Sequence, residues 1–284
     1  MKPPPFLPYA WMLLSATAFS VMAICTRALT EECNWQIIAM CRTGLAMLFA
    51  AILAYRAGAT FVVLRPPTLW MRSLAGSVSL LCGFFAMTHS NVSEVLVMTN
   101  MYPLWVAVLS WPILGEVPSL EVWAAILLSI AGVCLMHPPQ EFAGQMAYGA
   151  AILSSFTSGI ALIGLHKLKD IDPRAIVTHF SGVALIASVV ACFVFPWETS
   201  NPVTVSTLLL LLGVGGSATA GQLLLTKAFT SGPAARVSVI GLSQVAIVML
   251  LEAIIWQRRF DFQTLFGMSL VVAPTAWMIL RRAR

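Results

Sequence analysis

Two stretches of this chain align with each other without a gap, and this repeat constrains the fold more than any other feature. Residues 86 to about 132 align with residues 228 to about 274 at a constant offset of 142. A membrane unit with an odd number of spans inserts its second copy in the opposite orientation, which gives an inverted repeat. The identical pairs are Ala86 and Ala228, Thr88 and Thr230, Val95 and Val237, Val97 and Val239, Val106 and Val248, Leu109 and Leu251, Ile113 and Ile255, and Leu128 and Leu270.

The composition indicates a membrane environment. Hydrophobic residues make up 59% of the 284 residues and charged residues only 10%, whereas about 25% of the residues of a soluble domain are charged. This apolar excess is larger than one globular core can bury, so lipid is expected to solvate much of the surface. The net charge of +5 therefore reports on membrane topology rather than on nucleic acid binding.

Neither a cofactor nor a metal is expected. The six cysteines form no C-x-x-C pair and have no histidine at metal-ligand spacing, so we interpret them as small apolar packing residues. The chain also lacks the G-x-x-x-x-G-K-[ST] loop that binds nucleotide phosphates. ATP hydrolysis by this chain is therefore not expected as an energy source.

Apolar runs of about 17 to 25 residues match a hydrocarbon core about 30 Å thick, and they predict ten transmembrane helices. Charged residues, glycines and prolines separate these runs. We expect an all-α integral membrane protein with two inverted five-helix repeats, residues 1–140 and residues 141–284. The predicted spans are 9–27, 35–55, 70–88, 92–113, 119–136, 145–165, 174–195, 205–228, 233–256 and 262–281.

Basic residues set the expected orientation. Eleven Lys and Arg residues, among them Arg72 near the start of the third span, fall on the side of the N-terminus. Three fall on the opposite side, namely Arg27, Arg258 and Arg259. By the positive-inside rule, both termini are expected in the cytoplasm and the protein in the cytoplasmic (inner) membrane.

Each half carries a set of short motifs. They are Ala86, Ser90, Pro103 and Leu114-Gly115-Glu116 in the first half, then Ala228, Gly232-Pro233, Arg236-Val237-Ser238 and Gln244 in the second. These motifs resemble the EamA-type branch of the drug/metabolite transporter superfamily. The resemblance covers nearly the whole chain and implies an inverted repeat and transport of a small metabolite, coupled to a proton gradient or to exchange. Val245 and Arg258 depart from the pattern, where a second proline and a second glutamate are common, so the halves need not move as equals.

The fourth predicted span carries the candidate substrate-binding residues of the first half. Four of them follow a spacing of four, three and four residues, which places them on one helix face. Pro103 is expected to kink this span, because it removes a backbone hydrogen bond. The alternative that the stripe faces lipid or packs on a neighbour stays open. The stripe is Glu94, Met98, Met101 and Trp105, with Asn100 and Tyr102 beside it.

The ninth predicted span contributes Arg236, Ser243 and Gln244 to the candidate site. Under the offset of 142, Gln244 aligns with Tyr102 and Arg236 aligns with Glu94. Inversion then places Glu94 and Arg236 near opposite ends of one pathway. Tyr102 and Gln244 lie at mid-membrane, where inverted-repeat transporters bind substrate. The alternative is that each charge pairs or reaches water at its own interface.

Three further ionisable residues are candidates for ion coupling or for a structural charge. Arg42 lies about two turns into the second span, where it has the reach to pair with Glu94 or with a substrate carboxylate. His89 and His179 titrate near neutrality and are candidates for carrying protons, although a lone membrane histidine is more often a packing residue.

These features predict a secondary transporter of a small organic metabolite, with amino acids or related amphiphiles favoured, that works by alternating access. The expected partners are the substrate, the lipid bilayer, and protons or a counter-substrate, in a monomer or homodimer. One alternative is a membrane enzyme on lipid-linked substrates, which would need catalytic groups clustered at one depth. Another is a scaffold that does not transport. The sequence favours a protein that is not an enzyme, because no aspartate lies within any predicted span.

Overall fold

The computed structural model describes residues 6–29, 32–89, 95, 98–136, 145–195, 204–257 and 259–280. Regular structure in these ranges is helical, and no strand occurs in them. The helices are α1 (Leu7–Leu29), α2 (Trp35–Arg56), α3 (Pro67–His89), α5 (Tyr102–Leu114), α6 (Leu120–Met136), α7 (Gln145–His166), α8 (Pro173–Val194), α9 (Val205–Ser231), α10 (Ala234–Gly241), α11 (Ser243–Trp256) and α12 (Phe262–Leu280).

Within the described ranges, eight segments are long and apolar enough to cross a membrane, and α10 and α11 together form one of them. The predicted all-helical membrane class is therefore confirmed. α5 and α6 are shorter apolar helices that lie where the fourth and fifth spans are predicted. The 17 residues of α6 rise about 25 Å, close to the thickness of the hydrocarbon core.

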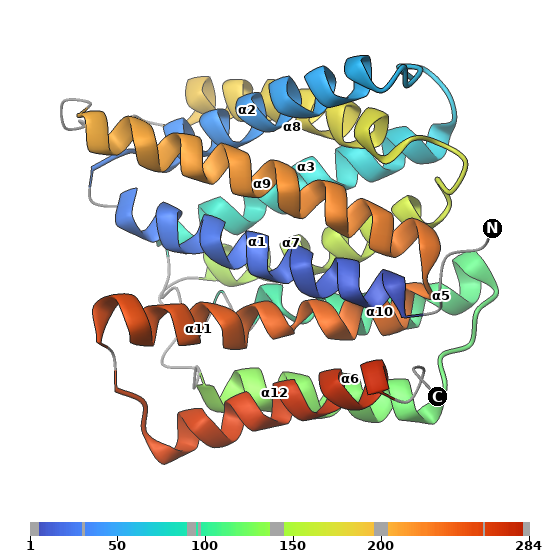
Figure 1. Cartoon of the computed structure of the whole chain (residues 1–284), viewed down its shortest axis with the longest axis vertical. Helices are drawn as coiled ribbons and strands as arrows, with labels where there is room; N and C mark the ends of the chain where they lie inside the picture. The colour runs from blue at the N-terminus through green and yellow to red at the C-terminus, as the bar shows by residue number, and fades with distance from the viewer. Residues whose placement is uncertain are drawn as a thin grey trace.

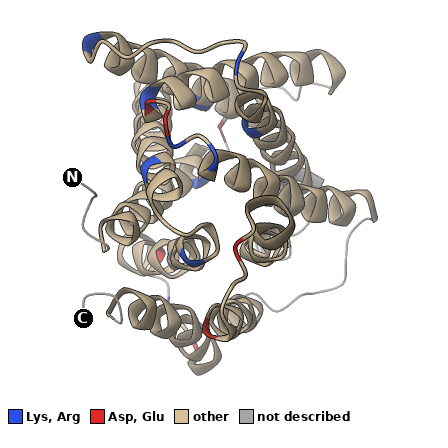
Figure 2. Ribbon diagram, turned by 90° about the vertical axis from the view of Figure 1, so that its right-hand side faces the viewer, with Lys and Arg blue, Asp and Glu red and all other residues tan. Residues whose placement is uncertain are grey.

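The helices lie side by side in a stack, with α2 and α8 at one edge and α6 and α12 at the other (Figure 1). α1 begins and α12 ends at the same end of the helices, which we call the terminal end (Figure 1). A view onto this end shows several Lys and Arg segments near it (Figure 2). Basic residues near one end are what the positive-inside rule uses to set orientation.

The packed helix pairs follow the sequence repeat. Under the repeat offsets, α1 corresponds to α7 and α3 corresponds to α9. The close packing of α1 on α9 is therefore matched by that of α3 on α7. The pairs α2 with α8 and α6 with α12 each join one helix to its own counterpart. Such matched pairs are expected where two copies are related by a two-fold axis.

Glycines allow the closest approach of α6 and α12. A Cβ atom on Gly132 would lie 2.6 Å from the carbonyl oxygen of Gly267, and a Cβ atom on Gly267 would lie 2.7 Å from the carbonyl oxygen of Gly132. The two glycines therefore face each other, and the backbones meet without a side chain between them. Small residues are enriched at such membrane interfaces because they permit this contact.

Candidate functional site

Two helices are interrupted at equivalent places in the two halves. The chain turns at Asn100 and Met101 before α5, and it turns at Leu242 between α10 and α11. At the offset of 142, Asn100 corresponds to Leu242. At both turns a backbone amide bonds the carbonyl three residues earlier, from Met101 to Met98 and from Leu242 to Val239, each at 3.1 Å. Helix interruptions inside membrane bundles are typical of binding sites for substrates and ions.

Pro103 explains the first interruption. Its ring nitrogen carries no hydrogen, so it cannot continue the helical bonding to the carbonyl of Thr99. Pro103 lies in the first turn of α5, where a helix tolerates proline best. The predicted break in the fourth span thus lies just before Pro103, between the helical residues 98–99 and the start of α5 at Tyr102.

The two interruptions are joined by Tyr102. Its hydroxyl donates a hydrogen bond to the carbonyl oxygen of Ser238 in α10, at 3.2 Å. A Cβ atom added to Gly241 would lie 2.1 Å from this hydroxyl and 2.6 Å from the Met12 methyl group of α1. Gly241 is therefore the residue that leaves room for Tyr102 beside the second interruption.

Trp105 connects α5 with α7. Its indole Nε1 donates to the Ser155 hydroxyl at 3.0 Å, and its ring meets the Phe156 ring edge to face at 5.2 Å between centroids. A Cβ atom on Gly159 would lie 2.7 Å from the Trp105 Cβ atom. Trp105 therefore packs on α7 and has its indole N–H satisfied.

A group of hydroxyls lies between α3 and α7. The Ser79 and Ser158 hydroxyl oxygens are 2.6 Å apart, and the Ser154 hydroxyl donates to the Ser79 carbonyl oxygen at 2.8 Å. Ser79 and Ser154 are buried. These contacts tie the first half of the chain to the second at mid-helix.

The second interruption carries a buried hydroxyl that has no partner in the part of the chain that the structure describes. The Ser243 side chain is 5% exposed, and its hydroxyl has no hydrogen-bond partner among the described residues. Gln244 is half-buried, and its backbone carbonyl accepts a bond from the Ser20 hydroxyl at 3.2 Å. A buried hydroxyl without a partner costs free energy, which makes this position a candidate contact for a ligand or water.

A turn divides the predicted stripe along the fourth span. The turn at Asn100 and Met101 separates Met98 from Trp105, so they do not lie on one unbroken helix face. Met98 packs on the apolar cluster of α6, α11 and α12, whereas Trp105 packs on α7. Asn100 and Met101 are half-buried at the turn itself. Glu94 and the side chain of His89 lie outside the described residues.

The remaining predicted charges lie apart from the interruptions. Arg236 is half-buried in α10, and Arg42 is half-buried in α2, with no ion pair recorded for either guanidinium among the described residues. His179 lies on α8, with Nδ1 at 2.8 Å from the Ser73 hydroxyl and Nε2 at 3.2 Å from the Val63 carbonyl oxygen. Both of its nitrogens are thus engaged by α3 and the segment before it.

Each end of the bundle has a contact between a basic and an acidic side chain that joins two parts of the chain. At the end opposite the terminal end, Arg27 of α1 pairs with Glu252 of α11, and its guanidinium lies 4.7 Å from the centroid of the Trp256 ring. At the terminal end, Nε2 of His166 lies 3.3 Å from Glu116. His166 aligns with Arg27 at an offset of 139. The two pairs therefore occupy related places at opposite ends.

His166 lies between two hydrogen-bond acceptors. Its Nδ1 is 2.8 Å from the Phe229 carbonyl oxygen, and its Nε2 faces the Glu116 carboxylate. Both ring nitrogens are therefore engaged, and the ring links α7 to α9 and to the segment after α5 at the terminal end.

Apolar side chains pack around the His166 contact. Most come from the beginnings of α1, α3, α8 and α10 and from the ends of α7 and α9, together with Val106 of α5 and Ile240 near the end of α10, and all are fully or almost fully buried. The helix ends that converge on the terminal side are therefore held together by one cluster. Its members include Tyr9, Leu69, Leu165, Leu168, Ile176, Phe229 and Ala234.

Arg72 is buried, although the sequence predicts it as a charge at the cytoplasmic interface. It is 4% exposed and bonds the Gln222 side chain of α9 at 3.1 Å. A sequence signal exists, because Arg72 follows Pro67 by five residues and thus lies more than one turn inside α3. Charge counting alone cannot separate this case from an interfacial arginine.

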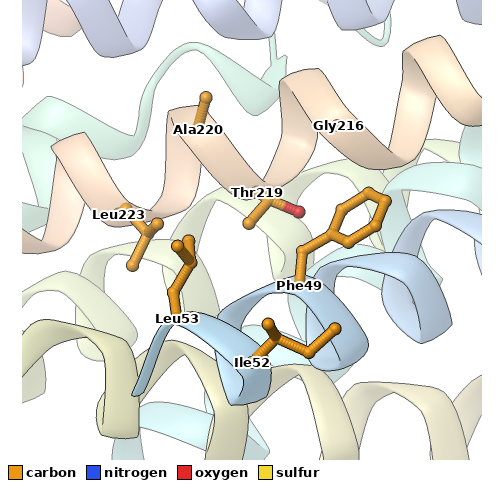
Figure 3. A pocket seen from close by; sticks show the side chains of 7 residues that line it. All are labelled: Phe49, Ile52, Leu53, Gly216, Thr219, Ala220 and Leu223. Carbon is orange, nitrogen blue, oxygen red and sulfur yellow. The ribbon is translucent and has the colours of Figure 1, made fainter. Parts of the chain in front are cut away.

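A groove of about 400 Å³ lies between α2 and α9, away from the interrupted helices (Figure 3). Its one polar side chain, Thr219, donates its hydroxyl to the Gly215 carbonyl oxygen at 2.7 Å. Exposed apolar residues on a membrane-spanning helix face lipid, so the groove suits a hydrocarbon chain better than a polar substrate. It is lined by Phe49, Ile52, Leu53, Gly216, Thr219, Ala220 and Leu223.

A bundle of apolar helices in which two interrupted helices meet defines a membrane protein of the transporter type. The chain belongs to the EamA-like transporter family, whose pattern matches it twice, over residues 6–137 and over residues 145–280. The family resemblance seen in the sequence is thereby confirmed.

Characterised relatives cover nearly the whole chain. The pseudopaline exporter CntI of Pseudomonas aeruginosa (strain UCBPP-PA14) is 24% identical, over 92% of this chain and 91% of the exporter. Solute carrier family 35 member G1 of Mus musculus is 23% identical, over 99% of this chain and 80% of its own length. A crystal structure shares the fold, with a TM-score of 0.84 at 16% identity over 100% of this chain and 99% of that chain. These relatives support a transporter role in a membrane, with small molecules as substrates.

Proposed function

We propose that this protein is a secondary transporter that moves a small organic metabolite, an amino acid or a related amphiphile, across the cytoplasmic membrane by alternating access. In this proposal the fourth predicted span, which contains α5, and the fifth, which contains α6, cross the membrane together with the eight longer segments, so the protein has ten spans. Both termini face the cytoplasm, and the two halves, residues 1–140 and residues 141–284, rock against each other. Protons or a counter-substrate supply the driving force.

The meeting of the two interrupted helices supports this proposal best. Tyr102 from the first half reaches Ser238 and Gly241 of the second half, next to the turn at Leu242. Ser243 adds a buried hydroxyl that has no protein partner. A substrate between the halves would contact both, so its binding can bias how they pack against each other. The proposed site contains Met98, Asn100, Met101, Tyr102, Trp105, Ser243 and Gln244, with Glu94 and Arg236 toward the two ends of the pathway.

We infer that the structure represents the state closed at the terminal end. The apolar cluster around Tyr9 and Phe229 and the His166 contacts with Phe229 and Glu116 hold that end together. Opening it requires these contacts to separate. The ion pair between Arg27 and Glu252 is then the corresponding contact at the opposite end.

Transport by the purified full chain in proteoliposomes tests the proposal. Vesicles are exposed to a labelled amino acid mixture, and uptake and efflux are followed for the wild type and for the variants Tyr102→Phe, Ser243→Ala and Gln244→Ala. Ser269→Ala is the matched control, because the Ser269 hydroxyl is exposed and bonds only within α12.

The wild type and Ser269→Ala should transport at the same rate, and Gln244→Ala should lose about ten-fold or more, since it removes a polar contact at the site. Full activity in all three site variants would overturn the assignment of the site. Failure of the wild type to move any compound in either direction would contradict the proposed function.

A further inference from the structure

The guanidinium of Arg72 points into the membrane rather than out of it. A Cβ atom on Gly76, one turn further along α3, would lie 2.4 Å from a terminal nitrogen of Arg72, so the side chain extends from its Cα atom toward mid-helix. Its other terminal nitrogen bonds Gln222, nine residues before the end of α9 at Ser231. Nine residues of helix rise roughly 13 Å. An arginine near a helix end normally extends toward the membrane surface, and this one does not.

No carboxylate neutralises this charge among the described residues. The partners of the guanidinium are the neutral Gln222 amide and the face of the Phe180 ring, which lies 4.1 Å from Cζ. The Nε atom is buried and has no hydrogen-bond partner. A buried charge without a counter-charge costs several kcal/mol, so such groups normally pair or face a pathway.

Arg72 lies on the face of α3 that faces the second half of the chain. Arg72, Gly76 and Ser79 are spaced four and three residues apart and therefore share one side of the helix. Ser79 on this face contacts the hydroxyls of Ser154 and Ser158 in α7. The uncompensated cation thus continues a line of polar groups between the halves.

We propose that Arg72 is an anion-binding residue of the transport pathway and that the transported substrate carries a carboxylate. The inference rests on the proposed transport function and names the acidic group that the substrate must have. Nε and a terminal nitrogen of a guanidinium form a planar fork that matches a carboxylate. The terminal nitrogen on the Nε–H side is the one that bonds Gln222, so Gln222 fixes the plane of the fork. The second hydrogen of that nitrogen and the Nε–H are left for the carboxylate.

Binding of small carboxylates to the purified full chain in detergent tests this proposal. The probes are benzoate against benzamide and L-phenylalanine against L-phenylalaninamide, because the members of each pair differ at the carboxylate. The readout is the melting temperature as a function of probe concentration, since ligand binding raises apparent stability by mass action. Three variants alter the site, namely Arg72→Gln, Arg72→Met and Gln222→Glu. Arg174→Gln is the matched control, because it removes a positive charge from the same end of the bundle at a half-exposed position.

In the wild type and in Arg174→Gln, at least one acid should raise the melting temperature more than its amide does. The half-saturating concentration of that acid should rise at least ten-fold in Arg72→Gln. Gln222→Glu should weaken the acid similarly, because it supplies an internal carboxylate to Arg72. Equal effects of acid and amide on the wild type, or an acid effect that survives in Arg72→Gln, would overturn the proposal.

The melting temperature of the protein without ligand shows whether Arg72 has only a structural role. Replacing an uncompensated buried charge by an apolar side chain of similar length should leave the melting temperature unchanged or raise it, so Arg72→Met should be at least as stable as the wild type. A drop of several degrees in Arg72→Met would instead assign Arg72 to the folding of the bundle and contradict the proposal.

Proteoliposome transport separates this inference from the proposed function. Transport restricted to neutral or cationic compounds would support the transport function and contradict the anion site. Arg72-dependent binding of an acid without transport of any compound would support the anion site and contradict the transport function.

Discussion

The hydroxyl of Ser15 in α1 donates a hydrogen bond to the carbonyl oxygen of Gly221 in α9, at 2.8 Å. The hydroxyl of Ser154 in α7 donates to the carbonyl oxygen of Ser79 in α3, also at 2.8 Å. Ser15 aligns with Ser154 at an offset of 139, and Ser79 aligns with Gly221 at an offset of 142. One contact thus occurs twice, and each copy joins the first half of the chain to the second.

We expect Ser15→Ala and Ser154→Ala to destabilise the protein by similar amounts. Each removes one buried hydrogen bond to a carbonyl oxygen, which in a membrane protein contributes about 0.6 kcal/mol on average. Ser154→Ala also removes the longer contact of 3.3 Å with the Ser79 hydroxyl. Unfolding in a graded series of denaturing detergent measures the change, and Ser269→Ala serves as the control on an exposed hydroxyl. A loss confined to one of the two serines would show that the two contacts are not equivalent.

Gly241→Ala is expected to reduce transport strongly. The new Cβ atom would lie 2.1 Å from the Tyr102 hydroxyl, so the Tyr102 side chain must shift away from the second interruption. The double variant Gly241→Ala with Tyr102→Phe should recover part of the activity, because it removes the oxygen in the clash. Equal activity of the single and double variants in proteoliposomes would argue that Tyr102 does not set this distance.

The Arg27–Glu252 pair and the His166 contacts should each stabilise only the end of the bundle at which they lie. His166→Ala removes the ring between Phe229 and Glu116, so amide hydrogen exchange should rise in residues 226–234. Arg27→Ala should raise exchange in residues 250–256, because Glu252 loses its partner. Mass spectrometry of peptic peptides measures both. The same exchange pattern in the two variants would show that the two contacts do not stabilise separate ends of the bundle.

The crossing of α6 and α12 should not tolerate a methyl group. In Gly132→Ala the Cβ atom would lie 2.6 Å from the Gly267 carbonyl oxygen, which belongs to the backbone and cannot rotate away. We expect a lower melting temperature for this variant. Gly149→Ala is the matched control, because a Cβ atom there meets no atom within 4 Å and alanine favours the helix by about 1 kcal/mol. Its melting temperature should stay the same or rise.

The sequence predicts the helix positions well because apolar length and flanking breakers control them locally. The predicted span 35–55 and α2 (Trp35–Arg56) agree within a residue, as do 119–136 and α6 (Leu120–Met136). The interruption at Leu242 is not predicted, because its one local signal is the preceding Gly241, and an isolated glycine is tolerated inside a helix. Such a break depends on packing against other helices, and a local pattern does not contain that information.

The sequence by itself determined that this chain is a helical membrane protein of the EamA-like type, built from a repeated unit. Hydropathy and the repeat offset are properties of the chain that do not depend on which helices touch. The tertiary structure alone decided that Tyr102 meets Gly241 across the two halves and that Arg72 turns inward to Gln222. The direction of a long side chain depends on the space that neighbouring helices leave, and only the assembled bundle fixes that space.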